Sequence, residues 1–520
     1  MKALLSWCVL FLVSGMAQGI VSVAADEFRT AAQFAPRVDE LLDAKLAAAG
    51  VAAAPRSDDG EFLRRVYLDL VGRLPPVGAV RRFLDDPRAD KRERVIDDLL
   101  ASPRHATHLA NTWRQFMLPG NIDPEDLPSV AGVQNWLRRQ FAQNLRYDRV
   151  VSDFLVATGG GDSGPALYYT ALELQPEKLA ASTARIFLGL HLECAQCHKH
   201  PYDKWTQEDF WGYAAFFAQL AREGEMQRAG MVTLVDKQEG EVTLPDSDTV
   251  IPPRYPDGRL PAAGQGGTRR VQLAIWMASR ENVFLARAAV NRVWAHLFGR
   301  GLIEPVDDLS EQNAASHPEL LQELADYFVA SGFDLRELFR ALAYTRAYQR
   351  TSRRAADFEA PSELFAHMEM KTLTSEQLYD CLSDVLLPAA DAPRNVPAMR
   401  GIFDPRRLAF AAQMQMRGQN ATEYEAGVLQ ALTMLNGDQL DAAARGESSA
   451  LLAGLESPLF DDGERVETLF LATLCRFPTQ EERSQFATYV ERGAAAGRQR
   501  EALSDVLWAM LNSAEFVFNH

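Results

Sequence analysis

Hydrophobic residues recur at helical spacing along most of the chain. After Asp58 and Glu61, which have the spacing of a capping box, Phe62, Val66 and Leu70 fall on one helical face. The same period predicts further helices over residues 90–101, 104–118, 131–145, 176–189, 206–219, 270–279, 284–298, 318–330, 334–345, 374–387, 425–435, 464–475, 479–492 and 499–513. The pattern therefore predicts a mainly α-helical, multi-helix protein.

One region alternates between apolar and polar residues as a β-strand does. Residues 231–245 predict a small hairpin that turns near Gly240. The segment that follows is rich in proline and glycine and cannot hold regular structure. We therefore place a domain boundary in residues 226–267, with helical domains on both sides.

The N-terminus predicts export. Lys2 precedes an apolar stretch, and small residues up to Ala25 lead into Asp26, which is the layout of a signal peptide over residues 1–25. An uncleaved anchor is the alternative, because the apolar stretch is almost long enough to span a bilayer. Since no second stretch is as hydrophobic, we expect no membrane span after cleavage and a location in the periplasm, at the cell surface or outside the cell.

Net charge and cysteine content limit the possible partners and the candidate site residues. The net charge of −16 and the lack of a basic run exclude a nucleic-acid partner, whose phosphates would repel the protein. Cys381 and Cys475 follow apolar helical faces and are expected in the core. Cys194 and Cys197 have no such surroundings.

Residues 191–205 read HLECAQCHKHPYDKW and hold two of the chain's five cysteines and three of its nine histidines. Cys194, Cys197 and His198 have the C-x-x-C-H spacing of covalent c-type haem attachment. The spacing suits this chemistry because two thiols add to vinyl groups on one edge of the porphyrin and the next histidine ligates the iron. Such attachment takes place outside the cytoplasm, which agrees with the predicted export.

Three other interpretations of this stretch stay open. Cys194 and Cys197 could form a local disulfide or exchange thiols. They could also ligate zinc, together with His198 or, better placed, His200, and a remote residue. Alternatively, all of these residues are structural. The aromatic residues from Trp205 onwards are predicted to be the core of an amphipathic helix, although some could line a porphyrin.

A second group of polar residues lies on a predicted helix and in the loop after it. In one interpretation it is a packing hub in which Arg287 and Asn291 cap neighbouring backbone. In the other it is a polar cleft in which His296 is a ligand or base and Asp307 or Asp308 orients it. His296 is also our candidate for the second axial ligand of the haem, or for the remaining ligand of a metal.

Other motifs add little. His105 and His108 stand three residues apart on one predicted helix, but without a third ligand we expect surface or capping roles for them. The sequence contains no G-x-S-x-G, no H-E-x-x-H and no glycine-rich phosphate loop. A standard hydrolase or nucleotide enzyme finds no support.

Several longer stretches resemble a known pair of domains. Residues 62–76, 83–105 and 187–217 resemble domain of unknown function 1549. Residues 281–309, 316–349, 429–440 and 507–520 resemble its usual companion, domain of unknown function 1553. Such pairs are abundant in exported planctomycete proteins.

The resemblance implies an organisation rather than a chemistry. It gives an N-terminal domain over 36–225, which contains the C-x-x-C-H stretch, and a C-terminal domain over 268–520. His200 and Asp203 match the family's C-A-x-C-H-x-H-x-x-D pattern. Many relatives carry an additional N-terminal cytochrome c module with its own C-x-x-C-H, and this chain departs from them because its first domain follows the predicted signal peptide directly.

The sequence thus predicts an exported protein that binds haem c covalently, with zinc as the alternative metal, and that has an electron-transfer or redox role. The expected partner is a redox protein. A rival prediction is a non-redox scaffold that binds a cell-surface polymer. In it, a metal ion or a disulfide would cross-link the loop that contains Cys194 and Cys197. A third is an unfamiliar hydrolase that uses His296 with Asp307 or Asp308.

Overall fold

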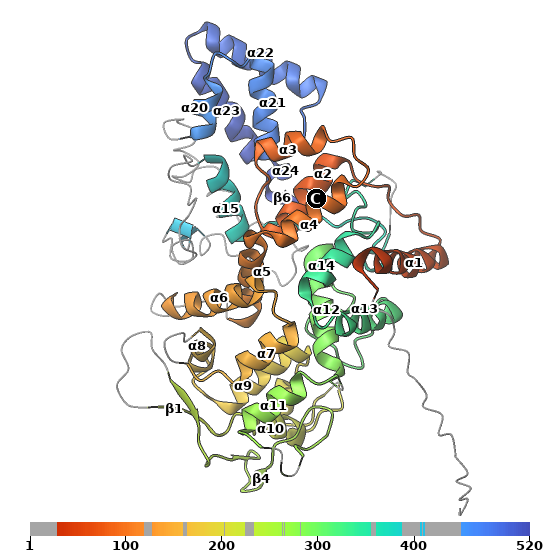
Figure 1. Ribbon diagram of the computed structural model, residues 1–520, viewed down its shortest axis with the longest axis vertical. Helices are drawn as coiled ribbons and strands as arrows, with labels where there is room; N and C mark the ends of the chain where they lie inside the picture. The colour runs from red at the N-terminus through yellow and green to blue at the C-terminus, as the bar shows by residue number, and fades with distance from the viewer. Residues whose placement is uncertain are drawn as a thin grey trace, which may run out of the picture.

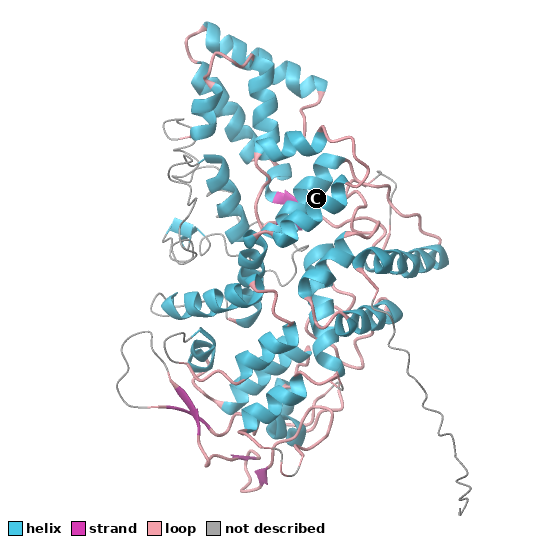
Figure 2. Ribbon diagram, viewed as in Figure 1, coloured by secondary structure: helices cyan, strands magenta, loops and turns pink. Residues whose placement is uncertain are grey.

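The structure is a computed structural model. It describes residues 29–118, 127–159, 164–201, 203–223, 233–262, 264, 266–280, 282–354, 360–386, 406–407, 409–410 and 449–520. Helices dominate these residues, and only short strands accompany them (Figure 2). The predicted mainly α-helical class is confirmed. The predicted signal peptide and the predicted helix over 425–435 lie outside the described residues.

The N-terminal half is a series of short helices. They are α1 (Ala31–Ala49), α2 (Asp59–Val71), α3 (Val77–Leu84), α4 (Lys91–Ala101), α5 (Pro103–Met117), α6 (Leu127–Ala142), α7 (Tyr147–Leu155), α8 (Gly164–Ala171), α9 (Pro176–Thr183), the π-helical turn η2 (Ala184–Leu188), the 3-10 turn η3 (Glu193–Gln196) and α10 (Gln207–Ala214). The helical period found most of them. It missed α1, α3, α7 and α8, which are short or, in α1, contain Pro36 and many alanines.

The C-terminal half continues in the same way. Its elements are α11 (Arg269–Met277), α12 (Val283–Phe298), α13 (Pro318–Ala330), α14 (Leu335–Ala343), the 3-10 turn η4 (Ser362–Leu364), α15 (Ser375–Leu386), α20 (Ala450–Leu455), α21 (Asp462–Thr473), α22 (Gln480–Ala495), α23 (Gln499–Leu511) and α24 (Ala514–Val517). The last helices return to the N-terminal half: α21 packs against α3, and α2 packs against the final strand.

The helices form an elongated molecule with two ends (Figure 1). One end holds α21, α22 and α23 beside α3 and α2, and the other holds α7, α9, α10 and α11 with the strands β1 (Leu220–Arg222) and β4 (Val250–Ile251). Helices α5, α12 and α14 lie between the two ends. One hydrophobic core runs through both ends, from Ala31 to Phe516. No described helix is both long and apolar enough to cross a membrane.

The strands pair differently from the predicted hairpin. Residues 234–236 form β2 (Leu234–Asp236), which pairs with β1 (Leu220–Arg222), whereas β3 (Val242–Thr243) pairs with β4 (Val250–Ile251). The two arms of the predicted hairpin therefore join separate two-stranded sheets. Alternation identified the arms as strands, but each arm buries its apolar residue against a different neighbour: Leu234 in the main core and Val242 in a small separate cluster.

Helix α2 is buried on nearly all sides and carries charged residues into the core. The Arg64 side chain is fully buried and donates hydrogen bonds to the carbonyl oxygens of Thr473 and Phe516 at 2.9 and 2.6 Å. The Arg65 side chain donates to the carbonyl of Tyr348 at 2.7 Å and pairs with Glu61. Because buried polar groups are costly unless they are bonded, these contacts hold α2 against the later segments around Tyr348, Thr473 and Phe516.

Candidate functional site

The C-x-x-C-H stretch follows α9 and the π-helical turn η2 along the chain. The π-helical turn η2 closes at Gly189, which has a left-handed φ of 65°, and a Cβ at this position would lie 2.4 Å from Leu309. The Gly189 carbonyl accepts a hydrogen bond from the amide of Leu309 at 2.8 Å. Only glycine fits this close approach. The turn therefore directs the chain from the core to the surface, beside the loop that holds Asp307.

Cys194 lies on the turn η3, which packs on α9 and α10, and Cys197 directly follows this turn. The carbonyl of Gln196 accepts a hydrogen bond from the indole of Trp211 at 3.1 Å, and Ala195 is buried. The amide of His200 donates to the carbonyl of Trp205 at 2.9 Å, which closes the loop that follows. The backbone of the turn is thus held in place while its polar side chains stay outside the core.

Cys194 and Cys197 are exposed and unbridged, and His198 is exposed beside them. Nδ1 of His198 lies 2.8 Å from the carbonyl oxygen of Lys199. Because a carbonyl can only accept, Nδ1 carries the proton in this contact, and in the neutral ring it is Nε2 that has the lone pair. The turn therefore presents two thiols and one imidazole nitrogen of the correct tautomer for a ligand at the surface.

The aromatic residues after the turn belong to the core. Phe210, Tyr213, Phe216 and Phe217 are buried in the main hydrophobic cluster, and so is Trp205, whose indole donates to Asp203 at 3.0 Å. This confirms the amphipathic-helix interpretation. These residues support the turn from below.

Next to the turn lies a cluster of three charged or titratable side chains, Arg185, His191 and Asp307, that the sequence did not predict. Asp307 pairs with Arg185 at 2.5 Å and with Nε2 of His191 at 3.2 Å. Burial opposes the charge on Asp307, but the hydrogen bonds from His191 and Arg185 prevail and lower its pKa. The hydrogen bond to Asp307 in turn raises the pKa of His191. His191 was visible in the histidine-rich stretch, but nothing local pointed to a partner more than a hundred residues away.

His296 lies among core residues, away from this group. Its Nε2 donates to the carbonyl oxygen of Asp69 at 2.8 Å, and its ring packs against His108 and Phe339. Asp307 pairs with His191 instead, so the predicted partnership of His296 with Asp307 is not formed. Asp308 accepts a hydrogen bond from the amide of Ser310, two residues further on. The structure brings His198 and His200 into one loop and gives His296 the contacts of a packing residue.

His105 and His108, expected at the surface or as caps, are buried in the same region. Nδ1 of His105 donates to the carbonyl of Leu70 at 2.8 Å, near the end of α2. Burial lowers the pKa of His105 to about 4, and it also lowers the pKa values of His108 and His296. The cluster is therefore neutral at pH 7. In the part of the chain that the structure describes, no three His, Cys, Asp or Glu side chains are grouped so that they could hold a metal ion.

The remaining residues of the second polar group form a packing hub. The amide of Asn291 donates to the carbonyl oxygens of Ile303 and Val306, both at 2.9 Å, and accepts from the amide of Ile303 at 3.0 Å. Arg287 donates to Gln322. The Asn291 contacts confirm that this residue caps neighbouring backbone, and they fold the loop 299–309 back onto α12, whereas the contact given for Arg287 is to a side chain and not to backbone.

Two family models match the chain. Residues 37–222, which include the C-x-x-C-H turn, match PSCyt2, protein of unknown function (DUF1549). Residues 269–387, which include α12 and the Asp307 loop, match PSD1, protein of unknown function (DUF1553). No curated protein and no solved structure matched. The chain therefore belongs to the proteins that pair these two domains of unknown function, as its motifs predicted.

Proposed function

We propose that this protein binds haem covalently through thioether bonds to Cys194 and Cys197, with His198 as an axial ligand, and that it transfers electrons outside the cytoplasm. The observation that carries the proposal is the arrangement of η3. Both thiols are exposed and unbridged, and Nε2 of His198 keeps its lone pair because Nδ1 is bonded to the Lys199 carbonyl. A hydrogen bond at the other ring nitrogen is how proteins orient a ligating histidine.

The donor set fits the group chemically. A haem held by two thioethers and a histidine supplies a one-electron iron couple. The role of the chain is to hold and orient: the Trp211–Gln196 hydrogen bond fixes the turn, and the buried Ala195 anchors it between the two cysteines. Since the neighbouring aromatic residues are in the core, the group would lie at the surface, which suits exchange of electrons with a partner protein.

Export is part of the proposal. The predicted signal peptide would bring the chain to the compartment where haem is attached to C-x-x-C-H motifs. His296 has no part in the site, since its Nε2 is bonded to Asp69. A non-redox scaffold that binds a cell-surface polymer and has a zinc-stapled or disulfide-stapled turn is the alternative that the experiment must separate.

The test is an absorbance spectrum and a haem stain of protein exported by a host with a haem-attachment system. Because thioether bonds are covalent, the stain should survive denaturation and should be lost in Cys194→Ser/Cys197→Ser. The matched control is Cys381→Ser/Cys475→Ser, in which two buried cysteines are changed and the stain should remain. His198→Ala should keep the thioethers but change the spectrum.

Two results would overturn the proposal. A colourless protein with one zinc ion per chain would favour the metal-stapled scaffold. A colourless protein whose mass is lower by two hydrogen atoms, and whose thiols return on reduction, would show a Cys194–Cys197 disulfide.

A further inference from the structure

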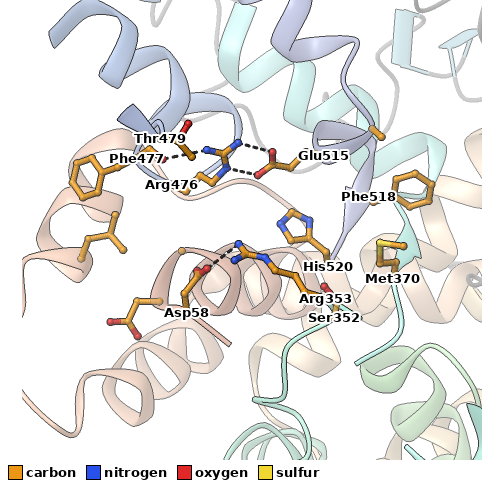
Figure 3. Close-up of a pocket in the computed structure, with 14 residues that line it drawn as sticks. Asp58, Ser352, Arg353, Met370, Arg476, Phe477, Thr479, Glu515, Phe518 and His520 are labelled. Atoms are coloured by element: carbon orange, nitrogen blue, oxygen red, sulfur yellow. Dashed lines mark hydrogen bonds and ion pairs between the residues drawn. The ribbon is translucent and has the colours of Figure 1, made fainter. Parts of the chain in front are cut away.

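A cavity of about 760 Å³ lies at the end of the molecule where α2, α22 and α24 meet (Figure 3). The walls come from the start of α2, the irregular segment that holds Ser352 and Arg353, the turn before α22 and the last residues of the chain. This end of the molecule is opposite to α9 and α10, on which the C-x-x-C-H turn packs. The volume is typical of a site for a small molecule, for which about 300–1,000 Å³ is the common range.

The turn before α22 is built to place two side chains on the wall of the cavity. Cys475 has a left-handed φ of 59°, which is strained for a residue other than glycine. Gly60 at the start of α2 approaches it closely, since a Cβ there would lie 3.0 Å from the Cys475 carbonyl oxygen. The backbone at Cys475 therefore lies in close contact with α2. The next two residues, Arg476 and Phe477, line the cavity (Figure 3).

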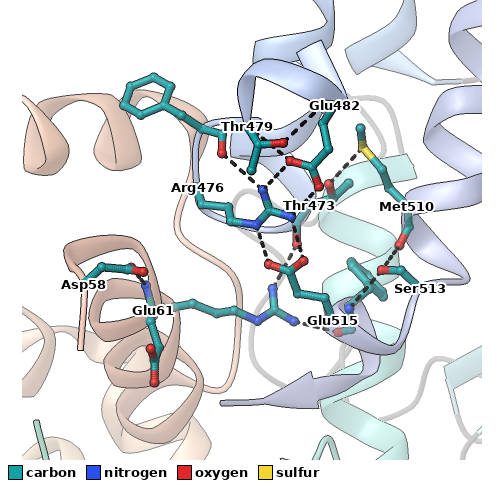
Figure 4. A network of polar contacts seen from close by, with 12 residues as sticks. Asp58, Glu61, Thr473, Arg476, Thr479, Glu482, Met510, Ser513 and Glu515 are labelled. Atoms are coloured by element: carbon teal, nitrogen blue, oxygen red, sulfur yellow. Dashed lines mark hydrogen bonds and ion pairs between the residues drawn. The ribbon is translucent and has the colours of Figure 1, made fainter. Parts of the chain in front are cut away.

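The Asp, Glu and Arg side chains of the lining have opposite partners, some within the lining and some outside it, such as Lys91 for Asp59. Arg476 pairs with Glu515 at 2.6 Å and with Glu482 at 2.9 Å, as Figure 4 shows. Arg353 pairs with Asp58 at 2.8 Å across the cavity opening (Figure 3). Because each of these charges already has an opposite partner, an ionic ligand would have to compete with a pair inside the protein, whereas a neutral ligand leaves the pairs intact. The lining suits a neutral ligand.

The remaining polar capacity is for hydrogen bonds. A paired carboxylate keeps lone pairs that can accept from a hydroxyl group, and an exposed guanidinium keeps N–H groups that can donate to one. Burial lowers the pKa of His520 to about 4, so its imidazole is neutral at pH 7 and can also accept or donate. A ligand with several hydroxyl groups matches this set.

The rest of the lining is apolar and partly open to solvent. Met370 is 53% exposed and Phe477 is 42% exposed, and Phe518 and Leu84 complete the apolar surface. Exposed large apolar side chains in a cavity offer a contact surface rather than a core. A pyranose ring has the matching chemistry, because it presents a face of C–H bonds to an aromatic ring and hydroxyl groups at its edge.

We infer that this cavity is a binding site for a neutral oligosaccharide, with Phe477 and Met370 as apolar contacts on its two sides and the paired carboxylates as hydroxyl acceptors (Figure 3). The site is separate from the C-x-x-C-H turn and does not depend on haem.

The test is titration of the full exported chain with cellotriose, maltotriose, mannotriose and xylotriose, followed by calorimetry and by NMR. At least one of them should bind, and Phe477→Ala should weaken its binding about three- to tenfold, which is the range for loss of one aromatic contact. Phe477→Trp should restore the affinity. Met370→Ala gives a second, independent reduction, and Leu459→Ala is the control because this side chain is 87% exposed and lies outside the lining.

Melting temperatures of all variants are measured first, so that weaker binding is not mistaken for unfolding. Three results would overturn the inference. One is the absence of binding by all four trisaccharides at millimolar concentrations. Another is unchanged affinity in both Phe477→Ala and Met370→Ala. The third is tighter binding of a sulfated or uronate-containing trisaccharide than of its neutral counterpart, because the paired charges would then not make the site selective for neutral ligands.

Discussion

Nζ of Lys371 lies 2.6 Å from Oδ1 of Asp69, and both side chains are buried. Asp69 belongs to α2, and Lys371 belongs to β5 (Lys371–Thr372). The same carboxylate accepts hydrogen bonds from Tyr348 at 2.8 Å and from Asn519 at 2.7 Å, and the ammonium group also donates to the carbonyl of His296 at 2.9 Å. The ion pair and its hydrogen bonds thus connect α2 with four later segments, those that hold His296, Tyr348, Lys371 and Asn519.

Removal of the cation from this pair should strongly destabilise the protein. Lys371→Met leaves a buried, uncompensated carboxylate, and we expect a loss of about 3–5 kcal/mol. Asp69→Asn/Lys371→Met should lose less, because the amide is neutral and its oxygen can still accept from Tyr348 or Asn519. The measurement is the urea midpoint of each variant.

An exposed pair provides the comparison. Arg94 and Asp90 are paired at 2.7 Å, but more than half of each side chain is exposed. Arg94→Ala should therefore change stability by less than about 1 kcal/mol. Equal losses for the buried and the exposed pair would contradict the role assigned to Asp69.

The two pairs of cysteines should differ in reactivity in protein made without haem attachment. Cys194 and Cys197 are exposed, whereas burial raises the pKa of Cys381 to about 12 and that of Cys475 to about 11. Since the thiolate is the reactive form, a thiol reagent should modify the first pair rapidly in the folded protein and the second pair only after unfolding. Mass mapping of the labelled peptides identifies them, and early labelling of Cys381 would contradict the burial.

Stability should fall below neutral pH because of buried histidines. Burial lowers the pKa of His105 from 6.5 to about 4, so the unfolded chain takes up a proton at a higher pH than the folded protein. The stabilisation from this group is therefore fully present above pH 6.5 and is lost as the pH falls towards 4, by about 3 kcal/mol in total. Urea midpoints between these two pH values measure the loss.

His105→Asn isolates this contribution. The amide can still donate to the carbonyl of Leu70, but it does not titrate. The variant should have a flatter pH dependence than the wild type whatever its absolute stability. Parallel curves for the two proteins would show that His105 does not cause the loss.

His191 should titrate in the opposite direction. The hydrogen bond to Asp307 raises its pKa above the ordinary value, although partial burial opposes this. Its stabilisation is therefore fully present below pH 6.5 and is lost as the pH rises through the raised pKa. Asp307→Asn should lower the pKa of His191, which NMR of the imidazole C–H signals measures.

Glu311→Gln is the control for this titration. Glu311 pairs with Lys204 on the surface, more than half of each side chain is exposed, and it has no contact with His191. The variant should leave the pKa of His191 unchanged. A shift as large as that in Asp307→Asn would mean that the general negative charge of the loop, and not the hydrogen bond, raises this pKa.

The helical period and the terminal signals of the helices could be read from the sequence. The helix predicted over 284–298 is α12, which begins after Asn282, whose side chain accepts from the amide of Phe284 at 3.0 Å, and ends at Gly299 in a left-handed conformation. These signals are local, because a cap or an αL residue acts within one turn of its own helix. For the same reason the burial of Cys381 followed from its helical face, whereas Cys475 is buried in the turn after α21 and not on the predicted helix.

The choice of partners could not be read in this way. His296 and Asp307 stand eleven residues apart, yet the first bonds to the carbonyl of Asp69 and the second bonds to His191. A helical face shows that a residue points inward but does not show which distant segment it meets. The hairpin prediction was wrong about pairing for the same reason.

The sequence by itself determined the helical class, the domain pair, the candidate thiols and the imidazole beside them, since composition, period and spacing are properties of neighbouring residues. The tertiary structure alone decided that the C-x-x-C-H turn lies exposed on a helical support, that His191 and not His296 is the partner of Asp307, and that Asp69 meets Lys371 in the core. These contacts join residues that are about a hundred to three hundred positions apart. Burial selects them, because a buried charge is stable only next to the particular group that compensates it.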